Sequence, residues 1–112
     1  MSKRADILLV QDMIDAAEKI FVYTKGFSFE QFCTDSKTSD AVIRNFEIIG
    51  EAASRISESL KEKYPDIEWH KIRGFRNRIV HDYIDIDYEI VWQIKETYLI
   101  ELLMQLRKIV TE

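Results

Sequence analysis

The sequence is poor in the residues that interrupt helices and in those that build disulfides. Among 112 residues there are 3 glycines, 1 proline and 1 cysteine. So few glycines and prolines favour helices joined by short turns over a loop-rich fold. The single cysteine, Cys33, excludes an internal disulfide and a paired-cysteine metal site, which suits a reducing cytoplasm. We therefore expect a mostly helical, cytoplasmic protein.

The sequence also lacks a long apolar run and an excess of positive charge. No hydrophobic stretch approaches the roughly 20 residues of a membrane span, so we expect no membrane association. The formal net charge of -4 gives no overall attraction to a polyanion,. Nucleic acid would have to bind at a local patch, and Lys71, Arg73, Arg76 and Arg78 form one. With 46% hydrophobic residues, the chain fits one domain over residues 1–112.

Apolar residues recur every three or four positions along most of the chain, which is the spacing of one helical face. The pattern predicts an all-α fold, an antiparallel helical bundle of four main helices plus a short extra helix. The main helices are expected over about 4–24, from 39 or earlier to 64 at the latest, over 69–83, and over about 88–110.

Local signals place the ends of these helices. Gly26 should end the first helix, and Ser28-Phe29-Glu30-Gln31 has the form of a capping box that starts the short one. Pro65 should end the second main helix because it disfavours helix in the residue before it. Asp66 and Asp87 are candidate N-caps of the third and fourth.

The third predicted helix has charge where it should be apolar. On a helix over residues 69–83, Arg76 lies near the middle of an otherwise apolar face. Next to this face runs a polar stripe, bordered by Arg73, that consists of His70, Gly74, Asn77 and His81. Glycine costs about 1 kcal/mol relative to alanine inside a helix. Another backbone or a ligand is therefore expected to come close at Gly74; alternatively, the glycine only relieves packing and the stripe is solvated.

Glu47 and Glu51, one turn apart on the second helix, are candidate partners for Arg76. Gly50 lies between them and, with Ala53, Ser54 and Ser57, forms a strip of small residues that would admit a close neighbour. Structural ion pairing with tight packing explains this pattern without any catalytic role.

Two arrangements that could suggest a metal site do not fit one. His70 and His81 would lie about 16 Å apart along a helix, too far to share one ion. Asp82, Asp85 and Asp87 lack the glycine and the distal glutamate of a calcium loop. We expect no metal and no cofactor.

RNA cleavage without a metal needs a base for the 2′-OH, an acid for the leaving oxygen, and a cation beside the phosphorane. Arg76 could supply the cation, and His81 could transfer the proton. Because each chain has only one histidine in this stretch, a symmetric dimer would provide both acid and base.

The stretch resembles the HEPN superfamily, and within it the HepT-like toxins of HepT/MntA toxin-antitoxin pairs. Arg76, His81 and Tyr83 match the Arg-x4-His-x-Tyr signature, with Asn77 as the polar residue after the arginine. The flanking runs 69–75 and 87–92, and Gly50-Glu51-Ala52, are also similar. The resemblance implies a metal-independent endoribonuclease that acts as a homodimer, with Arg76, Asn77 and His81 of each protomer in a shared cleft. It also implies a MntA-like nucleotidyltransferase antitoxin as partner, which transfers AMP to Tyr83.

Two other functions remain open from the residues. One is a non-catalytic helical dimerisation module that binds a nucleotidyltransferase partner, because the net charge and the nearby aspartates would repel RNA. The other is a nucleotide-binding pocket formed by Arg73, Arg76 and Tyr83.

Overall fold

The structure is a computed structural model that describes residues 3–81 and 85–111. Its elements, in chain order, are α1 (Lys3–Thr24), α2 (Phe29–Thr34), α3 (Ser36–Arg55), α4 (Glu58–Lys63), α5 (Trp69–Arg73), α6 (Phe75–Ile79), β1 (Val80–His81), β2 (Asp85–Ile86), α7 (Tyr88–Thr97) and α8 (Leu99–Thr111).

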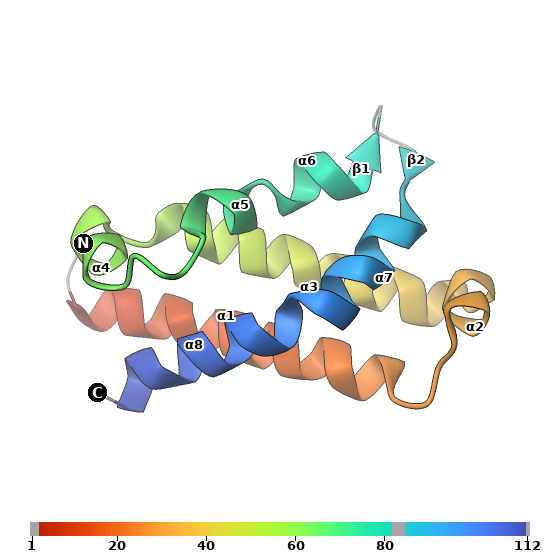
Figure 1. Ribbon diagram of the computed structural model, residues 1–112, viewed down its shortest axis with the longest axis horizontal. Helices are drawn as coiled ribbons and strands as arrows, with labels where there is room; N and C mark the ends of the chain where they lie inside the picture. Colours follow the sequence, from red (N-terminus) through yellow and green to blue (C-terminus); the bar gives the residue numbers. More distant parts are fainter. Residues whose placement is uncertain (1–2, 82–84, 112) are drawn as a thin grey trace.

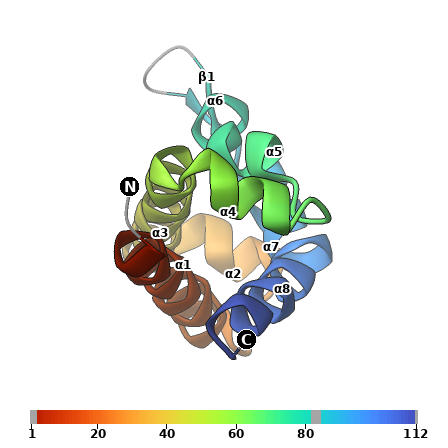
Figure 2. The ribbon, with the colours of Figure 1, turned by 90° about the vertical axis from the view of Figure 1, so that its left-hand side faces the viewer.

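The helices form an antiparallel bundle, which confirms the predicted fold class (Figure 1). Helices α1 and α3 run side by side in opposite directions, α5 and α6 return along α3, and α7 and α8 run back past α1. Viewed end-on, these helices surround a common interior, and α2 lies behind it (Figure 2). No helix within 3–81 or 85–111 is long and apolar enough to cross a membrane.

The interior is filled by apolar side chains from almost every helix. The largest fully buried ones are Met13, Ile20, Phe32, Phe46, Ile49, Ile72, Phe75, Leu99, Leu102 and Leu106. The ring of Phe75 packs edge-on against Phe46 at 5.7 Å and against Tyr98 at 6.0 Å between ring centroids. These contacts of Phe75 attach the short helix α6 to both α3 and the junction of α7 and α8.

The first two helices match their sequence signals closely. Gly26 has a φ of +79°, a conformation that glycine adopts without strain, and α1 ends just before it,. The Ser28 side chain accepts a hydrogen bond from the Gln31 backbone, and the Gln31 side chain accepts one from the Ser28 backbone. The predicted capping box is therefore confirmed, and α2 extends two residues beyond the predicted end at Phe32.

The second main helix is not continuous, contrary to the prediction. Helix α3 ends at Arg55, Ile56 is extended, and Ser57 is the N-cap of the separate helix α4. The break is stabilised from α1, because the buried carboxylate of Asp6 accepts hydrogen bonds from both the backbone N (3.0 Å) and the Oγ (2.5 Å) of Ser57. Apolar spacing alone does not reveal the break, because Ile56 stays in the core and Leu60 still packs against it.

The predicted third helix over 69–83 is wrong in its continuity. Helix α5 ends at Arg73 with Gly74 as its C-cap, α6 covers only Phe75–Ile79, and the chain then enters strand β1. The N-cap position of α5 is Glu68, not Asp66, and its side chain makes no capping hydrogen bond. The start of α5 is held instead by the Trp69 indole, whose Nε1 donates to the Tyr64 carbonyl at 3.1 Å.

After α6 the chain forms a short antiparallel hairpin that the sequence did not predict. Val80 pairs with Ile86 and His81 with Asp85. The base of the hairpin is closed by a 2.7 Å hydrogen bond from Asp87 N to the Ile79 carbonyl. The Asp87 side chain then accepts from Ile90 N at 3.1 Å, which confirms the predicted N-cap of α7.

The last predicted helix is also divided, because Tyr98 interrupts it between α7 and α8. Its predicted apolar face is otherwise retained: Val91, Ile94, Leu102 and Leu106 are buried. The break occurs where the Tyr98 ring packs on Phe75.

Candidate functional site

The motif residues lie where α6 passes into the hairpin. Arg76 and Asn77 belong to α6, whereas His81 belongs to β1. They therefore do not share one helical face, and the predicted polar stripe from His70 to His81 is not formed, because the helix breaks at Gly74 and ends at Ile79. The side chains of Arg76 and His81 and the whole of Tyr83 lie outside the described residues.

The backbone of α5 contacts α3 directly at Gly50. A Cβ atom at Gly50 would lie 3.3 Å from the Ile72 carbonyl oxygen and 3.7 Å from that of Arg73. The strip of small residues thus admits a close neighbour, as predicted. Among the described residues, a Cβ at Gly74 would meet the preceding turn, at 3.5 Å from the Lys71 oxygen and 3.6 Å from the His70 oxygen, and no backbone of another element. Gly74 instead forms the C-cap of α5.

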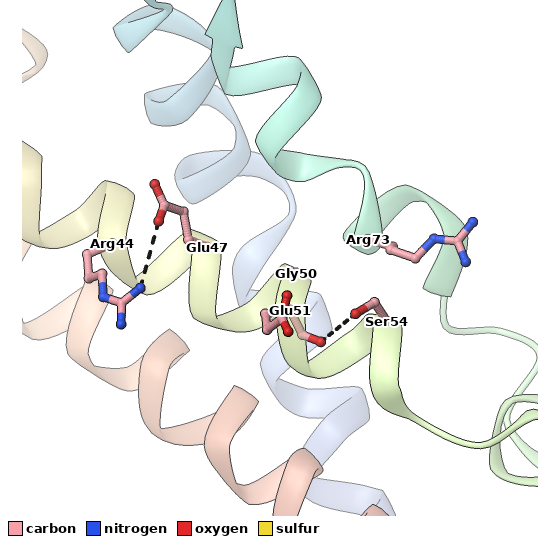
Figure 3. A pocket seen from close by; sticks show the side chains of 6 residues that line it. All are labelled: Arg44, Glu47, Gly50, Glu51, Ser54 and Arg73. Atoms are coloured by element: carbon pink, nitrogen blue, oxygen red, sulfur yellow. Dashed lines mark hydrogen bonds and ion pairs between the residues drawn. The ribbon is translucent and has the colours of Figure 1, made fainter. Parts of the chain in front are cut away.

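Beside this contact lies a pocket of about 370 Å³, which we call the α3 pocket (Figure 3). It is lined by Arg44, Glu47, Gly50, Glu51, Ser54 and Arg73. The structure thus brings together Arg73, Glu47 and Glu51 of the predicted site. Asn77 is exposed on α6 and does not line this pocket.

Arg44 lines the α3 pocket although the sequence analysis did not select it. Its Nη1 lies 3.8 Å from the Glu47 carboxylate. The pair has the i, i+3 spacing of a helical ion pair, and that spacing was the signal that could have found it. Glu47 therefore has a partner on its own helix. The predicted pairing of Arg76 with Glu47 and Glu51 falls on a side chain outside the described part of the chain.

Two arginines and two glutamates line the α3 pocket, and the structure shows an ion pair between Arg44 and Glu47. The Ser54 hydroxyl donates a hydrogen bond to the Glu51 backbone carbonyl at 2.7 Å. This bond does not involve the Glu51 carboxylate. The Arg73 guanidinium points away from Glu47 and Glu51, toward the outer side of α5 (Figure 3). Its Nη2 lies 3.4 Å from Nδ1 of His70.

Comparison with known families decides what kind of protein carries this site. Residues 13–109 match the family described as ribonuclease HepT-like. The chain belongs to this family. The resemblance to HepT-like proteins predicted from the sequence is therefore confirmed, and the family supports a ribonuclease as the enzyme class of this chain.

Similar HepT-like proteins come from several prokaryotes. A candidate RNase of Methanocaldococcus jannaschii is 36% identical over 94 residues, which cover 84% of this chain and 86% of the relative. Another from the same organism is 31% identical over 112 residues, covering 100% of this chain and 97% of the relative. A protein of Thermococcus cleftensis named as a probable ribonuclease HepT is 37% identical over 91 residues, covering 81% and 83%. No solved structure matches the chain.

Proposed function

We propose that this HepT-like ribonuclease is a metal-independent endoribonuclease that acts as a homodimer and serves as the toxin of a toxin-antitoxin pair. The observation that carries the proposal is the sequence Arg-x4-His-x-Tyr at residues 76–83, in a chain that matches the HepT-like family over residues 13–109.

The fold supports a division of roles within the motif. Arg76 is on a helix whose neighbours Phe75 and Ile79 are buried, so the backbone at Arg76 is held against the bundle. His81 follows on a strand, at the outer edge of the molecule (Figures 1 and 2). In the proposed reaction Arg76 stabilises the charge on the phosphorane, and His81 of each protomer transfers protons to or from the reacting oxygens. Asn77, exposed on α6, contacts the RNA backbone in the shared cleft.

Control of the enzyme is proposed to act through Tyr83. A nucleotidyltransferase antitoxin would attach AMP from ATP to the phenol oxygen and release pyrophosphate. The added phosphodiester would repel the substrate phosphate close to His81, and the adenosine would occupy space that RNA needs. Incubating the protein with ATP and the nucleotidyltransferase encoded beside it should add one AMP, found by mass spectrometry on Tyr83. A Tyr83→Phe variant should remain unmodified and active. Modification at another residue would contradict this part of the proposal.

The nuclease itself is tested by cleavage of single-stranded RNA in the presence of EDTA. The wild type should cleave it and leave 2′,3′-cyclic phosphate ends. Arg76→Ala and His81→Ala should each lower kcat by about 10²–10⁴-fold. A matched control is Arg107→Ala, which removes an exposed arginine whose surface ion pair with Glu18 contributes little,. Cleavage that EDTA abolishes, or that survives in His81→Ala, would overturn the mechanism.

The dimer is tested by mixing wild-type and His81→Ala chains. If the cleft is shared and uses one histidine as acid and the other as base, a co-expressed mixed dimer keeps only one of the two histidines and should be nearly as inactive as the His81→Ala dimer. A purified mixed dimer with half of the wild-type activity would instead indicate two independent sites. A monomeric wild type with full activity in analytical ultracentrifugation would exclude the shared cleft.

A further inference from the structure

A second pocket, which we call the α4 pocket, is formed by residues of α4 and α5. Its volume is about 180 Å³, and it is lined by Glu58, Lys61, Trp69, His70 and Arg73. Arg73 lines both the α3 pocket and the α4 pocket. Neither the HepT-like motif nor the proposed reaction uses Lys61 or His70.

The α4 pocket differs from the α3 pocket in its charge balance. Lys61 and Arg73 outnumber the single carboxylate of Glu58, and His70 adds a further nitrogen group. The Lys61 side chain is only 15% exposed, whereas that of Glu58 is 85% exposed, and their charged atoms are 3.7 Å apart. A pair with one partner almost fully in solvent is weak, so Glu58 offsets little of the positive charge. An anion is therefore favoured in the α4 pocket but not in the α3 pocket, where the Arg73 guanidinium points away from Glu47 and Glu51.

Two donors of the α4 pocket are in contact with each other. Nη2 of Arg73 lies 3.4 Å from Nδ1 of His70. Among the side chains that the structure describes, no carboxylate forms an ion pair with Arg73. A guanidinium has five N–H donors, so this contact leaves several of them for a ligand. The buried Trp69 ring forms a rigid wall, because its Nε1 is already bonded to the Tyr64 carbonyl.

The α4 pocket is close to the motif along the chain. His70 and Arg73 precede Arg76 by six and three residues, so even a fully extended chain would separate them from it by no more than about 22 and 11 Å. An RNA strand bound with one phosphate at Arg76 could therefore reach the α4 pocket with a phosphate a few nucleotides away.

We propose that the α4 pocket is a binding subsite for a phosphodiester of the RNA strand that flanks the cleaved one. Arg73 contacts the strand where it leaves the motif, and His70 and Lys61 hold the next phosphate. The subsite rests on the proposed ribonuclease function for its substrate, but its binding can be measured without cleavage.

The test compares Lys61→Gln with Lys63→Gln, two neutralised lysines on the same helix. Lys63 lines a different pocket, with Tyr64, Pro65 and Lys108, and is the matched control. Both changes are made in His81→Ala protein, and binding to a single-stranded RNA of about twenty nucleotides is followed by fluorescence anisotropy across a salt series. Lys61→Gln should weaken binding about threefold and reduce the salt slope by about 0.7, the loss of one phosphate contact. Lys63→Gln should change neither.

A second readout separates the subsite from the nuclease. In active protein, His70→Gln and Lys61→Gln should raise KM for the long RNA while leaving kcat within about twofold, and they should not affect cleavage of a dinucleotide, which cannot reach the α4 pocket. Equal effects of Lys61→Gln and Lys63→Gln, equal effects on long and short RNA, or no RNA binding by the wild type would each overturn the subsite. Lys61-dependent binding without cleavage by the wild type would support the subsite and overturn the ribonuclease proposal instead.

Discussion

The two long helices, α1 and α3, differ from the motif segment, residues 69–86, in the contacts that hold them in place. Helices α1 and α3 have 22 and 20 residues without a break. Between Trp69 and Ile86 no element that the structure describes exceeds five residues. The long helices are specified by many repeated apolar contacts, whereas the motif segment depends on a few individual ones: Gly50 against α5, Phe75 in the core, and Asp87 N on the Ile79 carbonyl. The difference teaches that many repeated contacts fix the long helices, whereas the motif segment depends on single contacts that one substitution can remove.

The largest stability effect is expected in the long helices. Ile20 on α1 is fully buried, so Ile20→Ala should lower the free energy of unfolding by about 2–5 kcal/mol, through lost burial and the cavity left behind,. Urea unfolding measures this. RNA cleavage per folded molecule should remain at the wild-type rate, because α1 carries no motif residue. A fall in kcat as large as the one expected for His81→Ala would show that cleavage depends on the packing of the long helices as well as on the motif segment.

The next largest loss of stability is expected at the contact between Gly50 of α3 and the backbone of α5. Gly50→Leu would push a side chain into the Ile72 and Arg73 carbonyls and should cost about 1–3 kcal/mol,. It should also lower cleavage, because α5 and α6 would move together away from α3. Gly74→Ala is the matched control: with a φ of -84° and ordinary contact distances, it should stabilise the protein by about 0.4–1 kcal/mol,. The same loss of stability from both substitutions would contradict the close approach at Gly50.

These two glycines also show what the sequence could and could not specify. Gly50 in a strip of small residues correctly indicated a close neighbour, since only small side chains permit such an approach. Gly74 inside an apparent helical repeat was misread, because a C-cap glycine and a mid-helix glycine look alike when the apolar spacing continues past them. The capping box at Ser28 and the cap at Asp87 were predictable, because each depends on residues three apart.

The sequence failed to predict the helix break before Ser57 and the hairpin for the same physical reason. The break before Ser57 depends on Asp6, which is 51 residues away in the chain, and the hairpin has only two residues in each strand. No local pattern reports such contacts. For the site, the sequence selected Arg73, Glu47 and Glu51 together, but the direction of Arg73 toward His70 is set by the packing of α5 and could not be predicted.

A smaller loss of stability is expected at the break between α3 and α4, where Ser57 bonds to Asp6 of α1. Ser57→Ala removes the cap of α4 and the hydroxyl bond to the buried Asp6 carboxylate, so it should cost about 1–2 kcal/mol,. Asp6→Ala should also destabilise, and the double variant should be less destabilised than the sum of the two single changes. Thermal or urea unfolding of all four proteins gives the coupling. If the losses of unfolding free energy in the two single variants add up to that of the double variant, the Asp6–Ser57 contact does not stabilise the break between α3 and α4.

The smallest effect is expected at Tyr98, whose hydroxyl is buried without a hydrogen-bond partner among the described residues. Burial, with smaller contributions from Glu68 and Glu101, raises the pKa of Tyr98 from 10.0 to about 12. Tyr98→Phe removes this unsatisfied group and should stabilise the protein by up to about 1 kcal/mol at neutral pH.

The pH dependence of Tyr98→Phe has a definite sign. Above pH 10 the unfolded chain loses the phenol proton while the folded protein keeps it, so stability falls until the pH reaches about 12,. The advantage of Tyr98→Phe over the wild type should therefore grow between pH 10 and pH 12 and be constant below that range. Urea unfolding at several pH values measures it. An advantage that shrinks with rising pH would contradict the buried hydroxyl.

Because Asp87 N donates a hydrogen bond to the Ile79 carbonyl, the residues between them could be replaced without moving the helices on either side. Asp87 N and the Ile79 carbonyl oxygen are 2.7 Å apart, so the helices on either side do not depend on how many residues lie between them. Each doubling of such a loop costs only about 0.6 kcal/mol of closure entropy. The stretch that carries His81 and Tyr83 could accept insertions or be grafted between homologous chains, and the helical core could then evolve independently of that stretch.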